Sequence, residues 1–166
     1  MSIRIKLLTS MAVFACGALA AIPVASANQE KTHAVKTHAV KGTMKLAILE
    51  SSPSADHFAA RWRGAPLGTA GVVGVTALTN TPTGLISEGR PTIYAKKGTV
   101  KLKTRDAVKF QPDGSIRLNG TFKVTGGGGK YKGATGGGTF NGALPPGSTL
   151  AVGTVVTFDV NGKARY

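Results

Sequence analysis

The chain has 166 residues and a net charge of +14 at pH 7, because 21 lysines and arginines are balanced by only 7 acidic residues. This length is sufficient for one domain with a hydrophobic core. The positive charge either keeps the protein soluble or attracts polyanions such as acidic wall polymers or anionic membranes. The sequence has no nucleic-acid-binding motif, so we do not expect nucleic acid as a normal partner.

Residues 1–27 have the three parts of a secretory signal peptide. Arg4 and Lys6 give a basic start, an apolar run follows, and the small residues Ala25-Ser26-Ala27 form a signal-peptidase site. At about 18 residues the apolar run is marginal for a membrane span, which needs about 20. We therefore expect cleavage after Ala27, a secreted protein, and no transmembrane anchor in the mature chain.

Cleavage would also change the chemistry that the chain can perform. It would lower the net charge from +14 to +12 and remove Cys16, the only cysteine. The mature chain would then have no disulfide, no thiolate nucleophile and no cysteine ligand for a metal. Its stability would depend on packing and backbone pairing alone.

Residues 28–42 contain a short duplication, in which Lys-Thr-His-Ala-Val occurs at 31–35 and again at 36–40. The low complexity predicts a flexible basic leader, with a first edge strand as the alternative. His33 and His38 have no third ligand near them in sequence, so we expect no metal site and no cofactor.

From residue 43 onward apolar and polar residues alternate with a period of two, which is typical of antiparallel strands with one buried face. Turn residues separate these runs. The pattern predicts an all-β domain over residues 43–166, an eight-stranded antiparallel up-and-down barrel, with an open sandwich as the alternative. The expected strands are 43–50, 56–64, 70–79, 89–95, 99–110, 115–125, 130–143 and 149–160.

A glycine-rich hairpin carries a family resemblance. Gly126 to Gly129 follow a strand, and Gly129, Tyr131, Gly133, Ala134 and Gly136 then match the pattern Gly-x-aromatic-x-Gly-Ala/Val-x-Gly. This segment resembles the signature hairpin of the allene oxide cyclase/dirigent barrel superfamily. The resemblance implies an eight-stranded barrel, often trimeric, with an apolar cavity. The pocket acids that those proteins use do not align with this chain, so the fold does not by itself imply their activity.

The glycines of this hairpin have a structural explanation. We expect Gly127 and Gly129 to adopt positive φ in a bulged turn, and Gly133 and Gly136 to leave room for Tyr131. A phosphate-binding loop is the alternative, but no helix follows to present its amide groups.

Strand parity places three acids on the face that is predicted to point inward. Glu50 shares parity with Leu46 and Ile48, and Asp56 and Asp106 share parity with Trp62 and Phe110 respectively. Carboxylates beside apolar surface have raised pKa values and can serve as acids or bases. These five residues, Glu50, Asp56, Trp62, Asp106 and Phe110, are the predicted ligand-binding site; the alternative is that the acids sit wet or ion-paired at the rim.

Three functions remain open at this point. A secreted barrel of this size is wide enough to bind one small apolar or amphipathic molecule without catalysis. It is alternatively an isomerase or cyclase acting on a hydrophobic substrate in the cavity. The third possibility is an envelope-associated protein whose basic surface binds anionic polymers or lipid.

Overall fold

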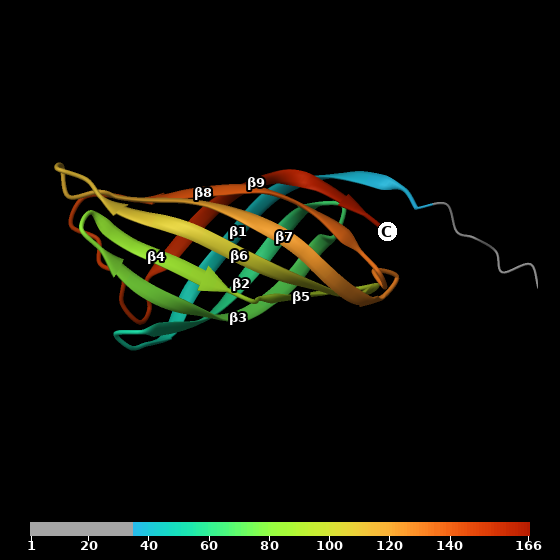
Figure 1. The fold of residues 1–166 in the computed structure, drawn as a ribbon, viewed down its shortest axis with the longest axis horizontal. Coiled ribbons are helices and arrows are strands. Elements are labelled where there is room, and N and C mark those ends of the chain that lie inside the picture. The colour runs from blue at the N-terminus through green and yellow to red at the C-terminus, as the bar shows by residue number, and fades with distance from the viewer. Residues whose placement is uncertain (1–34) are drawn as a thin grey trace, which may run out of the picture. The chain divides into compact units, whose positions relative to one another are not determined.

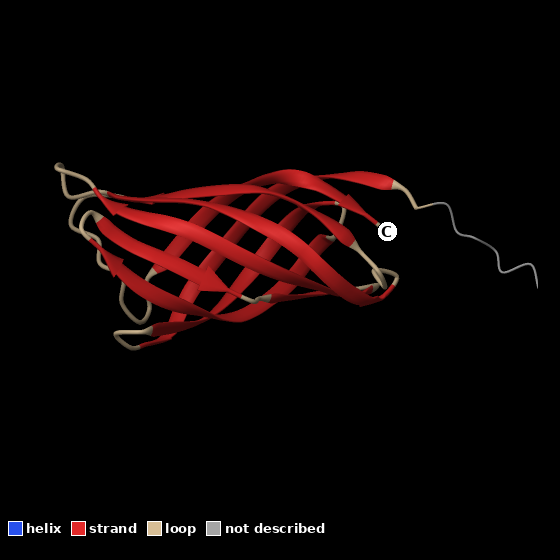
Figure 2. Cartoon of the chain, viewed as in Figure 1, coloured by secondary structure: helices blue, strands red, loops and turns tan. Residues whose placement is uncertain are grey.

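The structure is a computed structural model that describes residues 35–166, and every regular element in this range is a β-strand (Figure 2). The predicted signal peptide and most of the first copy of the duplication lie outside the described residues. No helix in the described range is long and apolar enough to cross a membrane. The strands are β1 (Thr37–Ser51), β2 (Ala55–Ala65), β3 (Gly68–Thr81), β4 (Gly84–Gly89), β5 (Thr92–Ala95), β6 (Gly98–Phe110), β7 (Ile116–Gly129), β8 (Thr135–Leu144) and β9 (Val155–Arg165).

The strands form a closed antiparallel barrel in sequence order (Figure 1). Apart from β4 and β5, each strand pairs with the next, and β9 pairs with β1, so the sheet has no free edge. The short strands β4 and β5 both lie between β3 and β6 and together occupy one position in the barrel. The fold is therefore the predicted eight-stranded up-and-down barrel and not an open sandwich.

Proline explains why one strand position is divided in two. Pro91 has no N–H to contribute to a ladder, so β4 ends and β5 begins beside it. Its carbonyl oxygen still accepts a hydrogen bond from the Leu102 N–H, with an N–O distance of 2.9 Å. The wall thus remains closed across the interruption.

Several predicted strand boundaries were wrong. The expected strand 89–95 is the two strands β4 and β5, and the expected strand 130–143 begins only at Thr135. The first strand begins at Thr37 and not at Thr43, because residues 37–42 of the predicted leader pair with β9. The last strand runs from Val155 to Arg165 and not from 149 to 160, because residues 145–154 form a loop. The Thr154 hydroxyl closes that loop by donating to the Thr149 carbonyl oxygen at 2.8 Å.

Aromatic side chains pack on glycines of neighbouring strands. A Cβ added at Gly138 or at Gly162 would lie 2.8 Å from the Phe122 ring, and one added at Gly42 would lie 2.9 Å from the Trp62 ring. Phe58 covers Gly74 and Phe158 covers Gly142 in the same way. Because glycine has no side chain, each ring can lie against the wall of the barrel, where it is buried without occupying the axis.

The glycine-rich hairpin differs in detail from the prediction. Strand β7 continues through Gly127 to Gly129, and the turn is formed by residues 130–134. Gly129 and Gly133 have φ of 61° and 73°, which L residues rarely adopt. The residue that makes room for Tyr131 is Gly127, where an added Cβ would lie 3.0 Å from the Tyr131 Cβ; neither Gly133 nor Gly136 has this contact.

The packing of Phe122 on Gly138 gives a stability prediction. The variant Gly138→Ala should lower the free energy of unfolding by about 2 kcal/mol, because the new methyl group meets the ring and the backbone of β9. Gly71→Ala is the matched control, since a Cβ at Gly71 meets nothing within 4 Å. Urea denaturation should show the control at least as stable as the unchanged protein, and equal losses in both variants would contradict the packing account.

The barrel interior as a candidate binding site

The inward face of the barrel encloses a cavity of about 190 Å³. Trp62 on β2 and Val100 on β6 both line it, so these two side chains point to the same interior, as strand parity predicts. On β4 and β5 the odd-numbered side chains, such as Leu85 and Ile93, line the cavity instead. An apolar cavity of roughly 150 Å³ is large enough to bind benzene. The interior therefore has room for one small organic molecule.

Most of the cavity wall is apolar. Met44, Leu46, Leu85 and Leu102 point inward, yet each keeps part of its surface accessible. Because these side chains face the lumen, that accessible surface lies on the cavity wall. A ligand that covered this surface would be stabilised by the hydrophobic effect.

The polar side chains of the wall gather toward one end of the cavity. Asp56, Thr76 and Asp106 lie in the halves of their strands nearer the β1–β2, β3–β4 and β6–β7 turns, which stand together in Figure 1, and Ser87 lies opposite Asp106. We call this region, together with Thr104, the polar end. Ser51, next to it on β1, is the one lining residue that is exposed to solvent. The cavity thus comes nearest to solvent at the polar end.

The strand register brings these polar residues together. Asp56 on β2 lies directly opposite Ser51 on β1 and Thr76 on β3. Ser87 on β4 lies directly opposite Asp106 on β6. Opposite residues on neighbouring strands have Cβ atoms about 5 Å apart, so these side chains are close neighbours on the wall.

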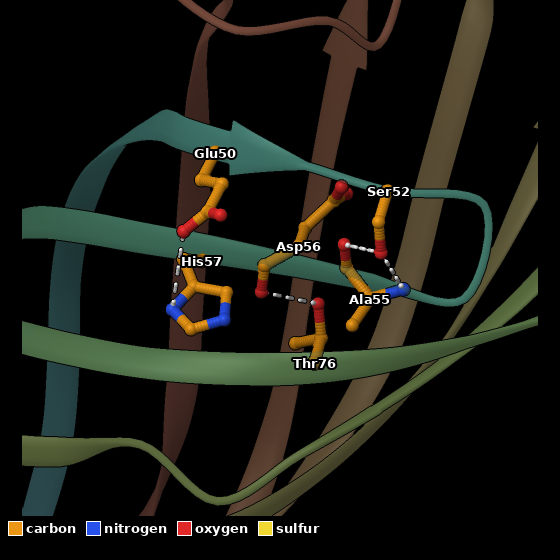
Figure 3. Close-up of polar contacts among 6 residues, drawn as sticks. All are labelled: Glu50, Ser52, Ala55, Asp56, His57 and Thr76. Carbon is orange, nitrogen blue, oxygen red and sulfur yellow. Dashed lines mark hydrogen bonds and ion pairs between the residues drawn. The ribbon is translucent and has the colours of Figure 1, made fainter.

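Asp56 is held beside a structured turn. The Ser52 hydroxyl donates to the Ala55 carbonyl oxygen at 3.0 Å and accepts from the Ala55 N–H at 3.1 Å (Figure 3). The main-chain oxygen of Asp56 accepts from the Thr76 hydroxyl at 3.5 Å. Its side-chain atom Oδ1 is buried and has no hydrogen-bond partner, which leaves an acceptor available at the cavity.

Asp106 is the more deeply buried carboxyl, with 8% of its surface exposed. Burial raises the pKa of Asp106 to about 6, and the hydrogen bond from Ser87 partly offsets this effect. On the other side of β6, Gly120 lies opposite Asp106 and a Cβ there would meet the Asp106 Cβ at 2.6 Å. A side chain at Gly120 would therefore collide with Asp106 and with the Phe140 ring, which covers this glycine.

Glu50 does not reach the cavity, contrary to the prediction. A bulge between Ile48 and Glu50 adds Leu49 to β1, so residues after it point to the opposite side. Glu50 lies opposite His57 on the outer face, with 3.9 Å between Oε2 and Nδ1, and 76% of its side chain is exposed (Figure 3). The hairpin residue with inward parity is Ser51 and not Glu50.

Phe110 does not line the cavity, whereas Trp62 does. Phe110 is the last residue of β6 and extends past the β4 pairing, which ends at Lys109, so 55% of its surface is exposed. Trp62 is 3% exposed and lines the cavity. The Trp62 indole N–H donates to the Gly64 carbonyl oxygen at 3.2 Å, which fixes the ring.

Aromatic residues contact one another at the other end of the cavity. The Tyr166 ring lines the cavity, stacks on His38 at 4.4 Å between centroids, and meets Tyr131 edge-on at 4.9 Å. Sequence reasoning missed Tyr166, because it lies outside the last predicted strand. It also missed Ser51, Thr76, Ser87 and Thr104, although strand parity already placed Thr104 on the inward face.

Comparisons with protein-family models, with curated proteins and with solved structures gave no match for this chain. Among residues 35–166, no group of three or more His, Cys, Asp or Glu side chains is arranged to hold a metal ion.

The buried Asp106 predicts a specific pH dependence of stability. Because its pKa is higher in the folded chain than the usual 3.8, the folded state binds this proton more tightly, and stability falls as the pH rises from about 4 to above 6. Asp106→Asn removes this penalty. The variant should gain about 3 kcal/mol relative to the unchanged protein between pH 4 and pH 7.

Urea denaturation at several pH values measures this difference. Asp159→Asn, which changes an exposed aspartate on the outer face, is the matched control and should not reproduce the gain. A stability difference between Asp106→Asn and the unchanged protein that is constant from pH 4 to pH 7 would show that Asp106 titrates as it does in the unfolded chain.

Proposed function

We propose that this protein binds one small apolar or amphipathic molecule inside its barrel without catalysing a reaction on it. The observation that carries the proposal is the apolar cavity of about 190 Å³, whose wall keeps accessible hydrocarbon surface on Met44, Leu46 and Leu102. Concave apolar sites with a few polar groups are the usual form of small-molecule sites.

The residue types of the wall support binding without catalysis. No histidine, lysine or arginine among residues 35–166 lines the cavity. The ionisable groups are Asp56, Asp106 and the Tyr166 phenol, and Tyr166 is placed at the far end from the two acids. Nucleophilic catalysis requires a nucleophile beside a base that activates it, and the wall offers only carboxylates near its serine and threonine hydroxyls.

We further propose that the barrel is exported and is related to the allene oxide cyclase/dirigent group. The basic start, apolar run and small-residue site within residues 1–27 support export. The glycine-rich segment from Phe122 to Phe140 supports the relationship to this group. The closed barrel also supports export, because a sheet without a free edge strand is protected from aggregation where intracellular chaperones are absent.

Ligand binding is tested with 1-octanol, a slender uncharged probe. Burial of its methylene groups at about 0.8 kcal/mol each should give measurable binding after the cost of association is subtracted. The variant Leu102→Trp should abolish binding because the larger ring fills the lumen. The matched control is Lys103→Trp, since the next residue points outward and should leave binding unchanged.

Isothermal titration calorimetry measures the binding in all three proteins. Native mass spectrometry of protein purified from the medium of the producing cells would show whether a small molecule co-purifies. Octanol binding that is the same in Leu102→Trp as in the unchanged protein would place the ligand outside the barrel and contradict the proposal.

A second candidate function, binding of an anionic polymer, is favoured by a row of lysines on the outer face. Lys103 on β6 and Lys123 on β7 are directly opposite each other, and the row continues through Gly137 to Lys163 on β9. We call these three lysines the basic row. Like charges directly opposite one another destabilise a sheet, so an anion that neutralised them would be bound favourably. At a strand spacing of about 5 Å, the row suits a chain of closely spaced negative charges.

Binding to inorganic polyphosphate tests this second function. The double variant Lys103→Gln/Lys123→Gln should weaken binding by about tenfold and reduce its salt dependence, because two charged contacts are lost. Lys96→Gln/Lys97→Gln, in the β5–β6 turn, removes the same charge elsewhere and should have a smaller effect. Equal effects of the two double variants, measured by fluorescence anisotropy at several salt concentrations, would show that only net charge matters.

A further inference from the structure

The charges of this protein are separated between the inside and the outside of the barrel. The outer face carries the basic residues, and none of the lysines or arginines among residues 35–166 lines the cavity. Asp56 and Asp106, in contrast, both line it. In a chain with a net charge of +14, the interior is therefore acidic.

The acidic groups have acceptor capacity that the protein does not use. Asp56 Oδ1 is buried and lacks a hydrogen-bond partner. Asp106 is more than nine-tenths buried on the cavity wall, where Ser87 is its hydrogen-bonding neighbour. Leaving a buried carboxylate with few donors is unfavourable, so a ligand that brings donors to this end would recover that free energy.

Two glycines border the polar end, and side chains of other strands cover them: Thr76 and Thr104 at Gly89, and Phe140 at Gly120. Gly89 lies opposite Thr76 and Thr104, and an added Cβ would meet Thr104 Oγ1 at 3.0 Å. Gly120 lies opposite Asp106. The polar end is thus bordered by two positions without side chains, while the rest of the wall is hydrocarbon and aromatic. This arrangement matches a molecule with a polar head and an apolar body.

We propose that the cavity selects an apolar molecule that carries an amino group, with the ammonium head at Asp56 and Asp106 and the hydrocarbon body against the apolar wall. This inference rests on the proposed ligand-binding function and defines its ligand class. An ammonium group supplies three donors and a positive charge to acceptor-only carboxylates. The carboxylate head of a fatty acid would be repelled by Asp56 and Asp106, and no basic side chain of residues 35–166 lines the cavity to neutralise it. The proposed ligand class therefore excludes fatty acids.

The proposal carries its own pH dependence. Ser87 from β4 and Gly120 from β7 lie opposite Asp106, and Asp56 and Thr104 line the same cavity, where no basic side chain of residues 35–166 is present. Burial raises the pKa of Asp106 to about 6, and an alkylamine stays protonated up to about pH 10. Amine binding should therefore be tight above pH 7 and weaken below pH 6, as Asp106 takes up a proton.

Three probes with the same hydrocarbon chain test the selectivity: n-octylamine, 1-octanol and octanoate. At pH 7.5 we expect octylamine to bind the full chain about tenfold more tightly than octanol, and octanoate to bind most weakly. Octylamine binding should weaken about tenfold between pH 7.5 and pH 5, whereas octanol binding should not.

Variants assign the selectivity to the two carboxyl groups. Asp106→Asn and, independently, Asp56→Asn should each reduce the preference for octylamine over octanol and leave octanol binding intact. Asp159→Asn, on the outer face, should leave the preference unchanged. Octanol binding in each variant reports whether the barrel has folded, and the two aspartates are tested separately so that one unstable variant does not prevent a conclusion.

The outcomes separate the two proposals. If none of the three probes binds, the ligand-binding function is wrong and the amine inference is wrong with it. If octanoate binds as tightly as octylamine, or if the preference survives both substitutions, the cavity binds ligands but the amine inference is wrong. A preference that disappears with either aspartate and with acidification supports it.

Discussion

Packing of aromatic rings on glycines is the interaction on which the hollow barrel depends. An eight-stranded barrel is narrow enough for side chains to fill it, and the four phenylalanines and the tryptophan that line the cavity would do so if they pointed to the axis. Phe122 instead lies across Gly138 and Gly162, and Trp62 lies across Gly42. The rings are buried against the wall, which provides hydrophobic stabilisation, and the axis remains free for the cavity of about 190 Å³. Stability and capacity for a ligand thus come from the same contacts.

The chemical character of the interior follows from the period of two and from register. Alternation sends the lysines and arginines of the strands outward and leaves the inward face mainly apolar, and Asp56 and Asp106 are inward because of their parity alone. The free-energy cost of burying the Asp106 carboxyl group is partly offset by the hydrogen bond from Ser87, and the raised pKa of Asp106 reflects the remaining cost. Groups that lower stability in the empty barrel are the groups expected to recognise a ligand.

The closed barrel, the number of strand positions and the inward direction of Asp56, Trp62 and Asp106 could all be predicted from the sequence, because alternation is a local property that survives into the fold. Glu50 could not be placed, since the bulge at Leu49 forms only when β1 pairs with β2, and a single extra residue reverses every side chain after it. Phe110 has the predicted parity but extends past its β4 neighbour, and exposure at a rim depends on where adjacent strands end. The role of Tyr166 depends on contacts with His38 and Tyr131, which are distant in sequence and give no local signal.

The central claim is that the barrel encloses an apolar space and not a solid core. A crystal structure of the protein under xenon pressure tests it most directly, because xenon enters dry apolar cavities and is easily located by its electron density. The account predicts a xenon site inside the barrel, within contact of Leu102 and Val156 and away from the two aspartates. Rings of Trp62 and Phe122 turned toward the axis, with no xenon between the walls, would contradict it.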